Sequence, residues 1–319
     1  MRILLVKTSS LGDVIHNLPV ATDIARAMPG AQIDWCVEES FAAIPALHPA
    51  VSRVIPVALR RWRRRLLGTT TLAEMKGFRR LLQGTRYDAV VDTQGLLKSA
   101  LLARLAHGER LGYAADSARE PVAARFYARR FSVDRQQHAV LRNRRLAAQG
   151  LGYTIDPDHI DYGLEVRPLA ADWLPPAPYV VCLTATSRAD KLWPPTHWHD
   201  LLGELHRRGI AAVLPAGSAG ERQRAAQIAA GCPSAIVAPA LDLAALAGLL
   251  RGAAATVGVD TGLSHLSAAV GTPTTALYTA TDPMLTGVVG SGFCRNLGGR
   301  GQLPSVADVL AALAAAPKV

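Results

Sequence analysis

The strongest constraint on the fold is an alternation of strand-like and helix-like stretches that runs through the first half of the chain. Apolar stretches of strand length alternate there with stretches whose apolar residues recur at helical spacing. This alternation is typical of a parallel, doubly wound α/β sheet. The expected strands are Arg2–Val6, Gln32–Val37, Arg53–Val57 and Tyr87–Asp92, and the expected helices lie near residues 14–28, 40–47, 70–83, 95–106 and 134–150.

The same alternation begins again after a proline-rich interval. Prolines occupy positions 157, 168, 175, 176 and 178, and strands are expected beyond them near residues 179–183, 210–214, 235–237, 254–259 and 274–278. The chain has 319 residues, half of them hydrophobic, which is enough for two cores. We therefore expect two α/β domains, residues 1–155 and 179–319, with a linker over residues 156–178 and a cleft between the sheets. The last helix is expected to pack back on the first domain.

Charge is divided unevenly between the two halves. Residues 1–150 hold 24 Lys and Arg against 12 Asp and Glu, whereas residues 151–319 hold 11 against 13. A basic half of this kind favours a polyanionic partner: nucleic acid, an anionic membrane surface or a phosphorylated lipid. The bases are most concentrated at Arg60-Arg61-Trp62-Arg63-Arg64-Arg65, where the alternative is a solvated surface run without a partner.

The sequence carries no pattern for export or membrane insertion. No apolar run is as long as a membrane span, and the chain passes from Met1-Arg2 directly into a strand. The four cysteines are far apart and form no Cys-x-x-Cys motif. We therefore expect a cytoplasmic protein whose cysteines are free thiols.

Polar residues lie at two strand-to-helix turns. Asp260, Thr261 and Gly262 follow the expected strand 254–259 and precede a helix, and Asp13 follows the first strand in the same way. Open α/β sheets bind ligands at the carboxyl ends of their strands, and the unpaired N–H groups of a helix start attract anions. A phosphorylated ligand fits the first turn, and a carboxylate facing a cleft fits the second. The alternative for both turns is that the acid only caps its helix.

Two further loops of the second half have groups that suit a nucleotide. Thr186, Ser187 and Lys191 offer hydroxyls and an ammonium group, which suit a diphosphate. Glu221 lies in the first turn of an expected helix, where it can accept ribose hydroxyls or only satisfy the helix dipole. The chain lacks both Gly-x-x-x-x-Gly-Lys-Ser/Thr and Gly-x-Gly-x-x-Gly, so an ATPase or a dinucleotide-dependent dehydrogenase is not favoured.

Five motifs spread from end to end of the chain carry a resemblance to a known family. They are Lys7–Val14, Val54–Val57 with Arg60–Arg63, Asp92–Ser99, Asp190–Pro194 and Val259–Leu266. In combination they resemble glycosyltransferase family 9, the ADP-heptose:lipopolysaccharide heptosyltransferases. The first two are more similar to the branch that adds the first heptose than to the branch that adds the second. The resemblance implies a GT-B fold, in which two Rossmann-like domains face one another across a cleft.

The resemblance also implies roles for the candidate residues. Asp13 is the general base, the second domain binds the nucleotide sugar, and arginines of the first domain bind the acceptor. The donor-binding residues are Thr186, Ser187, Lys191, Glu221, Asp260, Thr261, Gly262 and His265, and the acceptor-binding residues are Arg60, Arg61, Arg63, Arg64 and Arg119. One stretch departs from the family: Thr279-Ala280-Thr281-Asp282-Pro283 stands where Gly-Pro-Thr-Asp-Pro is common, which leaves the part of that loop in donor binding open.

The implied reaction is an inverting single displacement. Asp13 takes the proton of the 5-hydroxyl of the first Kdo sugar of Kdo2-lipid A, as that oxygen attacks the anomeric carbon of L-glycero-D-manno-heptose and ADP leaves. The lysine, the hydroxyls and a helix start balance the diphosphate charge, so we expect no metal ion and no cofactor. Asp156-Pro157-Asp158, the only Asp-x-Asp, is interpreted as a turn. We expect a monomer, peripheral on the anionic cytoplasmic face of the inner membrane, with no nucleic-acid partner.

Two alternatives remain open at this stage. A nucleic-acid-binding protein would use the arginine run and would bind arbitrary strands with a steep salt dependence. The run lacks the spread of aromatic residues found in base-stacking platforms, and that function would leave the second half without a role. Within the enzyme class, the alternative is a related heptosyltransferase with another acceptor sugar or another nucleotide.

Overall fold

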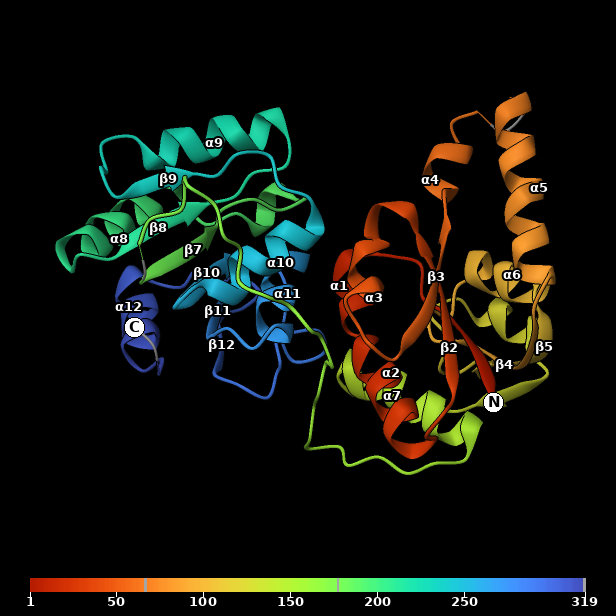
Figure 1. The fold of residues 1–319 in the computed structure, drawn as a ribbon. Helices are drawn as coiled ribbons and strands as arrows, with labels where there is room; N and C mark the ends of the chain where they lie inside the picture. Colours follow the sequence, from red (N-terminus) through yellow and green to blue (C-terminus); the bar gives the residue numbers. More distant parts are fainter. Residues whose placement is uncertain (66–67, 177, 318–319) are drawn as a thin grey trace. The chain divides into compact units, whose positions relative to one another are not determined.

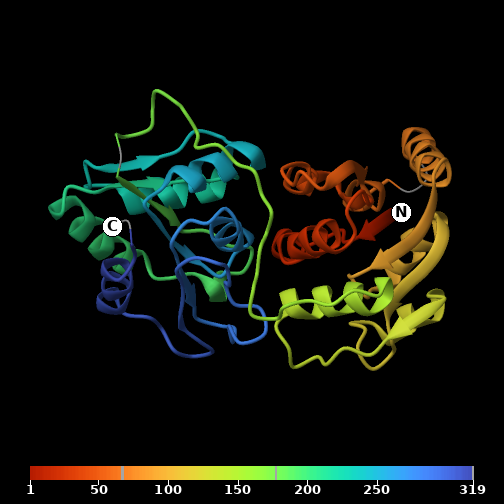
Figure 2. The ribbon, with the colours of Figure 1, turned by 60° about the horizontal axis from the view of Figure 1, so that its bottom comes forward.

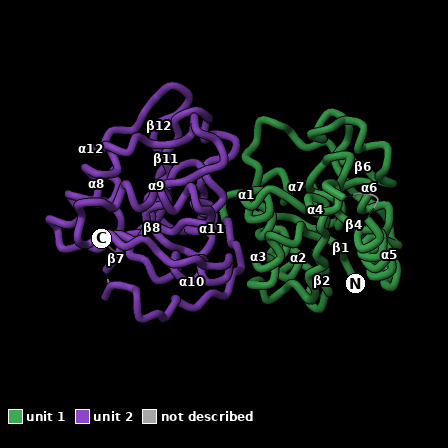
Figure 3. The backbone as a smooth tube through the Cα atoms, turned by 90° about the horizontal axis from the view of Figure 1, so that it is seen from above, with its two compact units in different colours: residues 1–159 green, residues 160–319 purple. Residues whose placement is uncertain are grey.

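The chain forms two compact units, each built on one parallel sheet. The computed structural model describes residues 1–65, 68–176 and 178–317. The units are Met1–His159 and Ile160–Val319 (Figure 3), so the division falls inside the interval that was expected to be a linker. Residue 177 of that interval and residues 318–319 of the expected second domain lie outside the described residues. Asp156 Oδ1 accepts a bond of 3.0 Å from Asp158 N, as expected for a turn.

Unit 1 has a six-stranded parallel sheet in the order β3-β2-β1-β4-β5-β6. Its strands are β1 (Arg2–Val6), β2 (Gln32–Glu38), β3 (Val51–Val57), β4 (Arg86–Asp92), β5 (His107–Tyr113) and β6 (Arg129–Phe131). Its α-helices are α1 (Leu11–Ile15), α2 (Leu18–Ala27), α3 (Ala43–Ala46), α4 (Leu59–Trp62), α5 (Thr69–Gln83), α6 (Leu97–Leu105) and α7 (Ala139–Leu151), with 3-10 turns η1 (Glu39–Phe41) and η2 (Pro121–Phe126).

Helices cover both faces of this sheet. The core on one face joins Leu4 of β1 and Val90 of β4 to Trp62, Phe78 and Leu102 of α4, α5 and α6. On the other face α2 packs beside α7 (Figures 1 and 2). The single helix expected near 14–28 is two helices, and Pro19 lies in the first turn of the second, where proline needs no N–H partner.

Unit 2 repeats the same layout. Its sheet has the order β12-β11-β10-β7-β8-β9 and is parallel throughout. Its strands are β7 (Tyr179–Leu183), β8 (Ala211–Leu214), β9 (Ala235–Val237), β10 (Ala255–Val259), β11 (Thr274–Tyr278) and β12 (Cys294–Gly298). Its helices are α8 (Pro195–Arg207), α9 (Ala219–Ala229), α10 (Leu243–Gly252), α11 (Gly262–Ala269) and α12 (Val306–Ala314), with a 3-10 turn η3 (Ala189–Lys191).

The last helix packs on the sheet of unit 2, and its expected packing on the first domain stays a prediction. α12 packs against α8, β11 and β12, all within unit 2. Val309 and Leu313, one helical turn apart, are buried in the same core as Trp193 and Leu201. Burial of these side chains holds the helix in its own unit.

Both sheets have the strand order of a Rossmann-like fold, counted along the chain as third, second, first, fourth, fifth and sixth. The order reverses between β1 and β4 in unit 1 and between β7 and β10 in unit 2. Ligands of open α/β sheets bind beyond the carboxyl ends of the strands at such a switch point. The fold therefore directs attention to the segments that follow these four strands.

Candidate functional site

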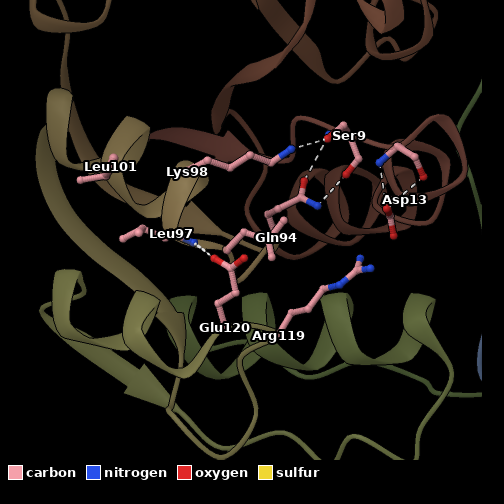
Figure 4. A pocket seen from close by; sticks show the side chains of 10 residues that line it. Ser9, Asp13, Gln94, Leu97, Lys98, Leu101, Arg119 and Glu120 are labelled. Carbon is pink, nitrogen blue, oxygen red and sulfur yellow. Dashed lines mark hydrogen bonds between the residues drawn. The ribbon is translucent and has the colours of Figure 1, made fainter. Parts of the chain in front are cut away.

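A pocket lies at the switch point of unit 1. It has a volume of about 720 Å³ and is formed by the segments that follow β1 and β4, with contributions from α6 and from the segment before η2 (Figure 4). Asp13 and Arg119, both predicted from the sequence, face this pocket together. Its lining residues are Ser9, Ser10, Asp13, Gln94, Leu96, Leu97, Lys98, Leu101, Arg119 and Glu120.

Asp13 lies in the first turn of α1 and is fixed by the start of that helix. Its Oδ2 accepts hydrogen bonds from Ser10 N at 2.8 Å and from Ser10 Oγ at 3.1 Å. The capping alternative is therefore realised, but it uses only this one carboxylate oxygen. Because the carboxylate also lines the pocket, capping and catalysis are compatible roles. In Figure 4 the Arg119 side chain extends toward Asp13.

Gln94 joins the two segments that form the pocket. Its Oε1 accepts from Thr8 N at 2.9 Å and from Ser9 N at 3.2 Å, and its Nε2 donates to Ser9 O at 2.5 Å. Buried Asp92, at the end of β4, accepts a bond of 2.8 Å from Gln94 N. Desolvation raises the pKa of Asp92, while the bonds that it accepts oppose this rise. The segment after β4 thus holds the segment after β1 in place.

Two lysines contribute positive charge near Asp13. Lys98 donates to Ser9 Oγ at 2.8 Å and lines the pocket, whereas buried Lys7 donates to Thr93 O at 2.8 Å. Burial lowers the pKa of Lys7, and the carboxylates of Asp13 and Asp92 oppose this effect. Desolvation also lowers the pKa of Lys98. Arg60 and Arg63 act in the same direction, and Glu38 and Asp13 oppose them.

The arginine run lies close enough to the pocket for Arg60 and Arg63 to affect Lys98. Arg60, Arg63 and Arg64 are exposed. Arg61 is different, because its guanidinium binds two carboxylates, at 3.0 Å from Glu39 and 2.8 Å from Glu74.

Arg61 therefore stabilises the junction of α4 and α5. Glu74 also accepts a bond of 2.6 Å from the indole of buried Trp62. The sequence interpretation overlooked these acids because they lie outside the run, and the structure gives Arg61 partners other than an acceptor.

In unit 2, the side chains of Lys191, Thr281 and Thr186 bind Asp260, at the switch point after β10. Lys191 Nζ lies 2.6 Å from Asp260 Oδ2, and Thr281 Oγ1 donates to the same oxygen at 2.6 Å. Thr186 Oγ1 donates to Asp260 O at 2.9 Å. Lys191 and Asp260 are largely buried, with side-chain exposures of 18% and 13%. The loop after β7, the turn after β10 and the loop after β11 are thus joined at one point.

The loop that departs from the family pattern forms part of this cluster. Besides the bond from Thr281, Thr279 Oγ1 donates to Asp190 O at 2.7 Å. Asp190 belongs to η3, the turn that also carries Lys191. Threonine at position 279 therefore makes a bond that the common glycine does not offer.

The start of α11 leaves backbone N–H groups available beside Asp260. Thr261 is the N-cap residue, but its side chain makes no capping hydrogen bond. Gly258 lets this helix approach β10 closely, because a Cβ there would clash with Ser264 Oγ. Ser264 donates to Val259 O at 2.8 Å, and His265 is buried on the same helix. The N-terminal N–H groups of such a helix suit an anion.

For two predicted donor residues, Ser187 and Glu221, the structure shows no contact that points to a ligand. Ser187 is exposed next to Thr186. Glu221 Oε2 accepts from Gly217 N at 2.8 Å and Ser218 N at 3.3 Å, so the helix-capping alternative is realised for this residue. Its role toward a ribose stays a prediction.

Arg224, which was not predicted from the sequence, supports the loop after β7. Arg224 of α9 donates to Thr184 O at 3.1 Å and to Trp193 O at 2.8 Å, which lie at the two ends of that loop. Desolvation lowers the pKa of Arg224. Gln94, Lys98, Thr279 and Thr281 were also missed, although the first two lie in the motif Asp92–Ser99 and the last two lie in the departing loop.

Across residues 1–65, 68–176 and 178–317, no group of three or more His, Cys, Asp or Glu side chains is placed to hold a metal ion. Over the same described parts of the chain, none of the helices has both the length and the apolar character needed to cross a membrane.

Comparisons with known proteins agree with the geometry of both units. Residues 75–308 match glycosyltransferase family 9 (heptosyltransferase). Lipopolysaccharide heptosyltransferase 1 of Pseudomonas aeruginosa is 53% identical over 291 residues, covering 91% of this chain and 82% of that protein. The structure of Escherichia coli heptosyltransferase WaaC with ADP has a TM-score of 0.90 at 44% identity, covering 98% of both chains. WaaC with ADP-2-deoxy-2-fluoro heptose has a TM-score of 0.88 at 45% identity, with the same coverage.

Proposed function

The chain belongs to glycosyltransferase family 9, the heptosyltransferases, and we propose that it transfers L-glycero-D-manno-heptose from ADP-heptose to the first Kdo residue of Kdo2-lipid A. This reaction adds the first heptose of the lipopolysaccharide inner core. The observation that carries the proposal is the convergence of Lys191, Thr186 and Thr281 on Asp260 at the switch point of the second sheet. It supplies positive charge, hydroxyls and a helix start where a nucleotide diphosphate would bind.

Unit 2 binds the donor in this proposal. Lys191 pairs with the diphosphate, and Asp260 with Thr281 holds the ammonium group in position. The hydroxyl of Thr186 reaches the diphosphate by rotating away from Asp260 O, while exposed Ser187 needs no such exchange. The first N–H groups of α11 bind a phosphate oxygen. Glu221 accepts from the ribose with the oxygen that it does not use for capping, and His265 lies behind the heptose.

The chemical step is a single displacement with inversion. The 5-hydroxyl oxygen of Kdo forms a bond to the anomeric carbon of heptose, and the bond from that carbon to the diphosphate breaks. The hydroxyl proton passes to Asp13, and ADP leaves with the electron pair. The proton moves late in the step, when the attacking hydroxyl has become acidic.

No metal ion takes part in the step as we propose it. Lys191, the hydroxyls and the start of α11 stabilise the charge that develops on the leaving diphosphate. Turnover is therefore expected to be the same in the presence of EDTA as in the presence of added Mg²⁺, and a requirement for Mg²⁺ would contradict this part of the proposal.

Unit 1 binds the anionic acceptor. Arg119 and Lys98 line the pocket that contains Asp13, Arg60 and Arg63 act on the pKa of Lys98, and Arg64 is exposed next to Arg63 in the chain. Arginine suits this role because its planar fork pairs bidentately with phosphate and carboxylate groups. We further propose that the protein acts as a monomer on the anionic cytoplasmic face of the inner membrane, and that the excess of bases in residues 1–150 serves this surface rather than nucleic acid.

The proposal is tested by the product of the purified protein. With ADP-heptose and Kdo2-lipid A, mass spectrometry is expected to show an acceptor that has gained one heptose. Proton NMR is expected to show an anomeric configuration opposite to that of the donor. Transfer from another nucleotide sugar but not from ADP-heptose would favour a related glycosyltransferase. Tight, salt-steep binding to arbitrary DNA without any transfer would favour the nucleic-acid alternative.

A further inference from the structure

Helix α5 uses only a narrow stripe of its surface to pack on unit 1. Thr71, Phe78 and Leu82 are buried, and Glu74 is partly buried beside them. Phe78 meets the indole of Trp62 edge-on, with ring centroids 5.8 Å apart. The other residues of the helix are exposed except for Gln83 at its end, which is partly exposed. Figure 1 shows α5 on the outside of unit 1, where it adjoins α4 and α6.

One exposed face of α5 combines apolar and basic side chains. Leu72, Met75, Lys76 and Arg79 follow the spacing i, i+3, i+4 and i+7, which places them on one side of a helix. Leu72 is 45% exposed and Met75 is 40% exposed. Arg80 adjoins this face. We call Leu72, Met75, Lys76, Arg79 and Arg80 the α5 face.

Positive charge around the α5 face is not neutralised within unit 1. Residues 60–83 contain eight bases and one acid, Glu74, which is bound by Arg61 and Trp62. Among the described residues, Lys76 and Arg80 have no acidic partner, and Arg79 donates only to Gln83 Oε1 at 3.3 Å. Gly68 N donates to Arg65 O at 3.1 Å, so the helix starts beside the end of the arginine run.

The mixture of side chains on the α5 face favours a lipid surface over a nucleic acid. Leucine and methionine gain by entering an apolar phase, whereas lysine and arginine can reach phosphate headgroups from the same helix face. A single-strand platform would need exposed aromatic rings, but Trp62 and Phe78, the aromatic residues of this region, are buried.

We propose that the α5 face docks on an anionic phospholipid bilayer, with Leu72 and Met75 entering the headgroup layer and Lys76, Arg79 and Arg80 pairing with lipid phosphates. The inference deepens the proposed function, because the proposed acceptor is itself anchored in a membrane. α5 packs against α6, the helix whose Lys98 and Leu101 line the pocket of Asp13. Docking through α5 therefore holds the acceptor pocket of the same unit near the bilayer.

Vesicle binding tests this docking directly with the full-length chain and without any sugar substrate. The probes are vesicles of phosphatidylcholine with and without phosphatidylglycerol, at low and high salt. The wild-type chain is expected to bind only the anionic vesicles and to release as salt rises. Replacing Leu72 and Met75 by serine is expected to weaken binding about tenfold at both salt concentrations, since it removes apolar surface. Replacing Lys76, Arg79 and Arg80 by glutamine is expected to weaken binding at low salt and to flatten the salt dependence.

Leu81→Ser is the matched control. Leu81 is 42% exposed on the same helix but lies on the flank away from Leu72 and Met75, so its replacement is expected to leave vesicle binding unchanged. Thermal unfolding of each variant shows whether it is folded. Equal binding of wild type to vesicles without phosphatidylglycerol, unchanged binding of the Leu72/Met75 variant, or an equal loss in Leu81→Ser would overturn the docking proposal. Binding to duplex DNA that is tighter than to anionic vesicles would overturn it as well.

Kinetics separate docking from catalysis. On a deacylated, water-soluble acceptor, the α5-face variants are expected to match wild type, whereas on acceptor embedded in a bilayer their KM for acceptor is expected to rise about tenfold. An equal loss on both acceptors would contradict docking as the role of the α5 face. Vesicle binding without heptose transfer would leave the docking inference standing and refute the proposed function.

Discussion

In the proposed reaction, Asp13 combines a structural and a chemical role in one side chain. Ser10 binds only its Oδ2, through a backbone N–H and a hydroxyl, and the carboxylate lines the pocket at the switch point of unit 1. An amide oxygen accepts the same two bonds, and asparagine caps helices about as well as aspartate does. Substitution by asparagine therefore separates folding from proton transfer.

Asp13→Asn is expected to lower turnover by about 10²- to 10⁴-fold, roughly 3 to 5 kcal/mol of barrier, because it removes the general base. The temperature of thermal unfolding is expected to stay within experimental error of wild type. The measurements are initial rates of ADP release and a thermal melt. Near-normal turnover with an intact fold would show that another group takes the proton.

Lys191 is held by Asp260 in a geometry that suits a leaving diphosphate. Lys191→Ala is expected to weaken ADP binding by about ten- to a hundredfold, because a charge-assisted bond to phosphate contributes roughly 1.5 to 3 kcal/mol. Turnover is expected to fall with it. The neighbouring Asp190→Asn is the control, since Asp190 is exposed and pairs with Arg188 rather than with Asp260. Calorimetry that finds the same ADP affinity for Lys191→Ala and wild type would remove Lys191 from the donor site.

Thr281 fixes the carboxylate on which Lys191 depends. Thr281→Val keeps the shape of the side chain and removes the bond of 2.6 Å to Asp260 Oδ2. ADP affinity is expected to drop about tenfold, the magnitude of a hydrogen bond to a charged group. Thr286→Val, at an exposed position of the same loop, is expected to have no effect. If both substitutions change ADP affinity equally, the loop acts through its general stability and not through Asp260.

Among the elements, the α4–α5 junction explains why the arginine run is not uniform. Arg61 binds Glu39 and Glu74 and so belongs to the packing of this junction, whereas Arg60, Arg63 and Arg64 are exposed. Neutralising the last three by glutamine leaves the junction intact and removes the charges that are available to an acceptor.

This triple variant is expected to raise KM for acceptor, to leave KM for ADP-heptose nearly unchanged, and to flatten the salt dependence of acceptor use. Salt screens exposed charges beyond about 8 Å at physiological ionic strength, so removing the charges removes the salt effect. Arg61→Gln is the matched control. It is expected to lower the unfolding temperature and to raise KM for acceptor less than the triple variant does. A donor KM that moves as much as the acceptor KM would place the run outside the acceptor site.

Apolar periodicity predicted the central elements and failed at several peripheral ones. β1, β4, β10 and β11 carry runs of buried residues and were found from the sequence alone. β6 and β12 lie at sheet edges and contain Arg129-Arg130 and Arg295-Asn296, so their pattern does not differ from that of a loop. β5 begins with alternating exposed residues and was missed for the same reason.

Candidate residues that lie in local turns could be predicted from the sequence. Residues whose placement depends on contacts between distant parts of the chain could not. Asp13, Lys191 and Asp260 could be named as candidates from the sequence because they follow strands, at the end where open α/β sheets bind ligands, and their roles stay predictions. Arg224 reaches Thr184, 40 residues earlier in the chain, and only the packing of α9 beside α8 and β9 reveals that contact. The sequence likewise leaves open whether Glu221 caps its helix or binds a ligand, and the structure shows the capping contact.

At the scale of the whole molecule, the two units share one strand order but differ in charge and in the chemistry at their switch points. The first carries a carboxylate pocket within a basic half of the chain, and the second carries a lysine–aspartate cluster at a helix start. A reaction between an anionic acceptor and a nucleotide sugar needs both kinds of site. Each unit has one of these sites, with different side chains at the switch point of its sheet.

In the proposed reaction this chain adds heptose to an acceptor that carries none. The measurement is the rate of ADP release from ADP-heptose with Kdo2-lipid A and, in parallel, with the same acceptor already bearing one heptose. We expect rapid release with the first acceptor and release at the background rate with the second. Release only with the heptosylated acceptor would contradict it and would assign the protein to a later step of core assembly.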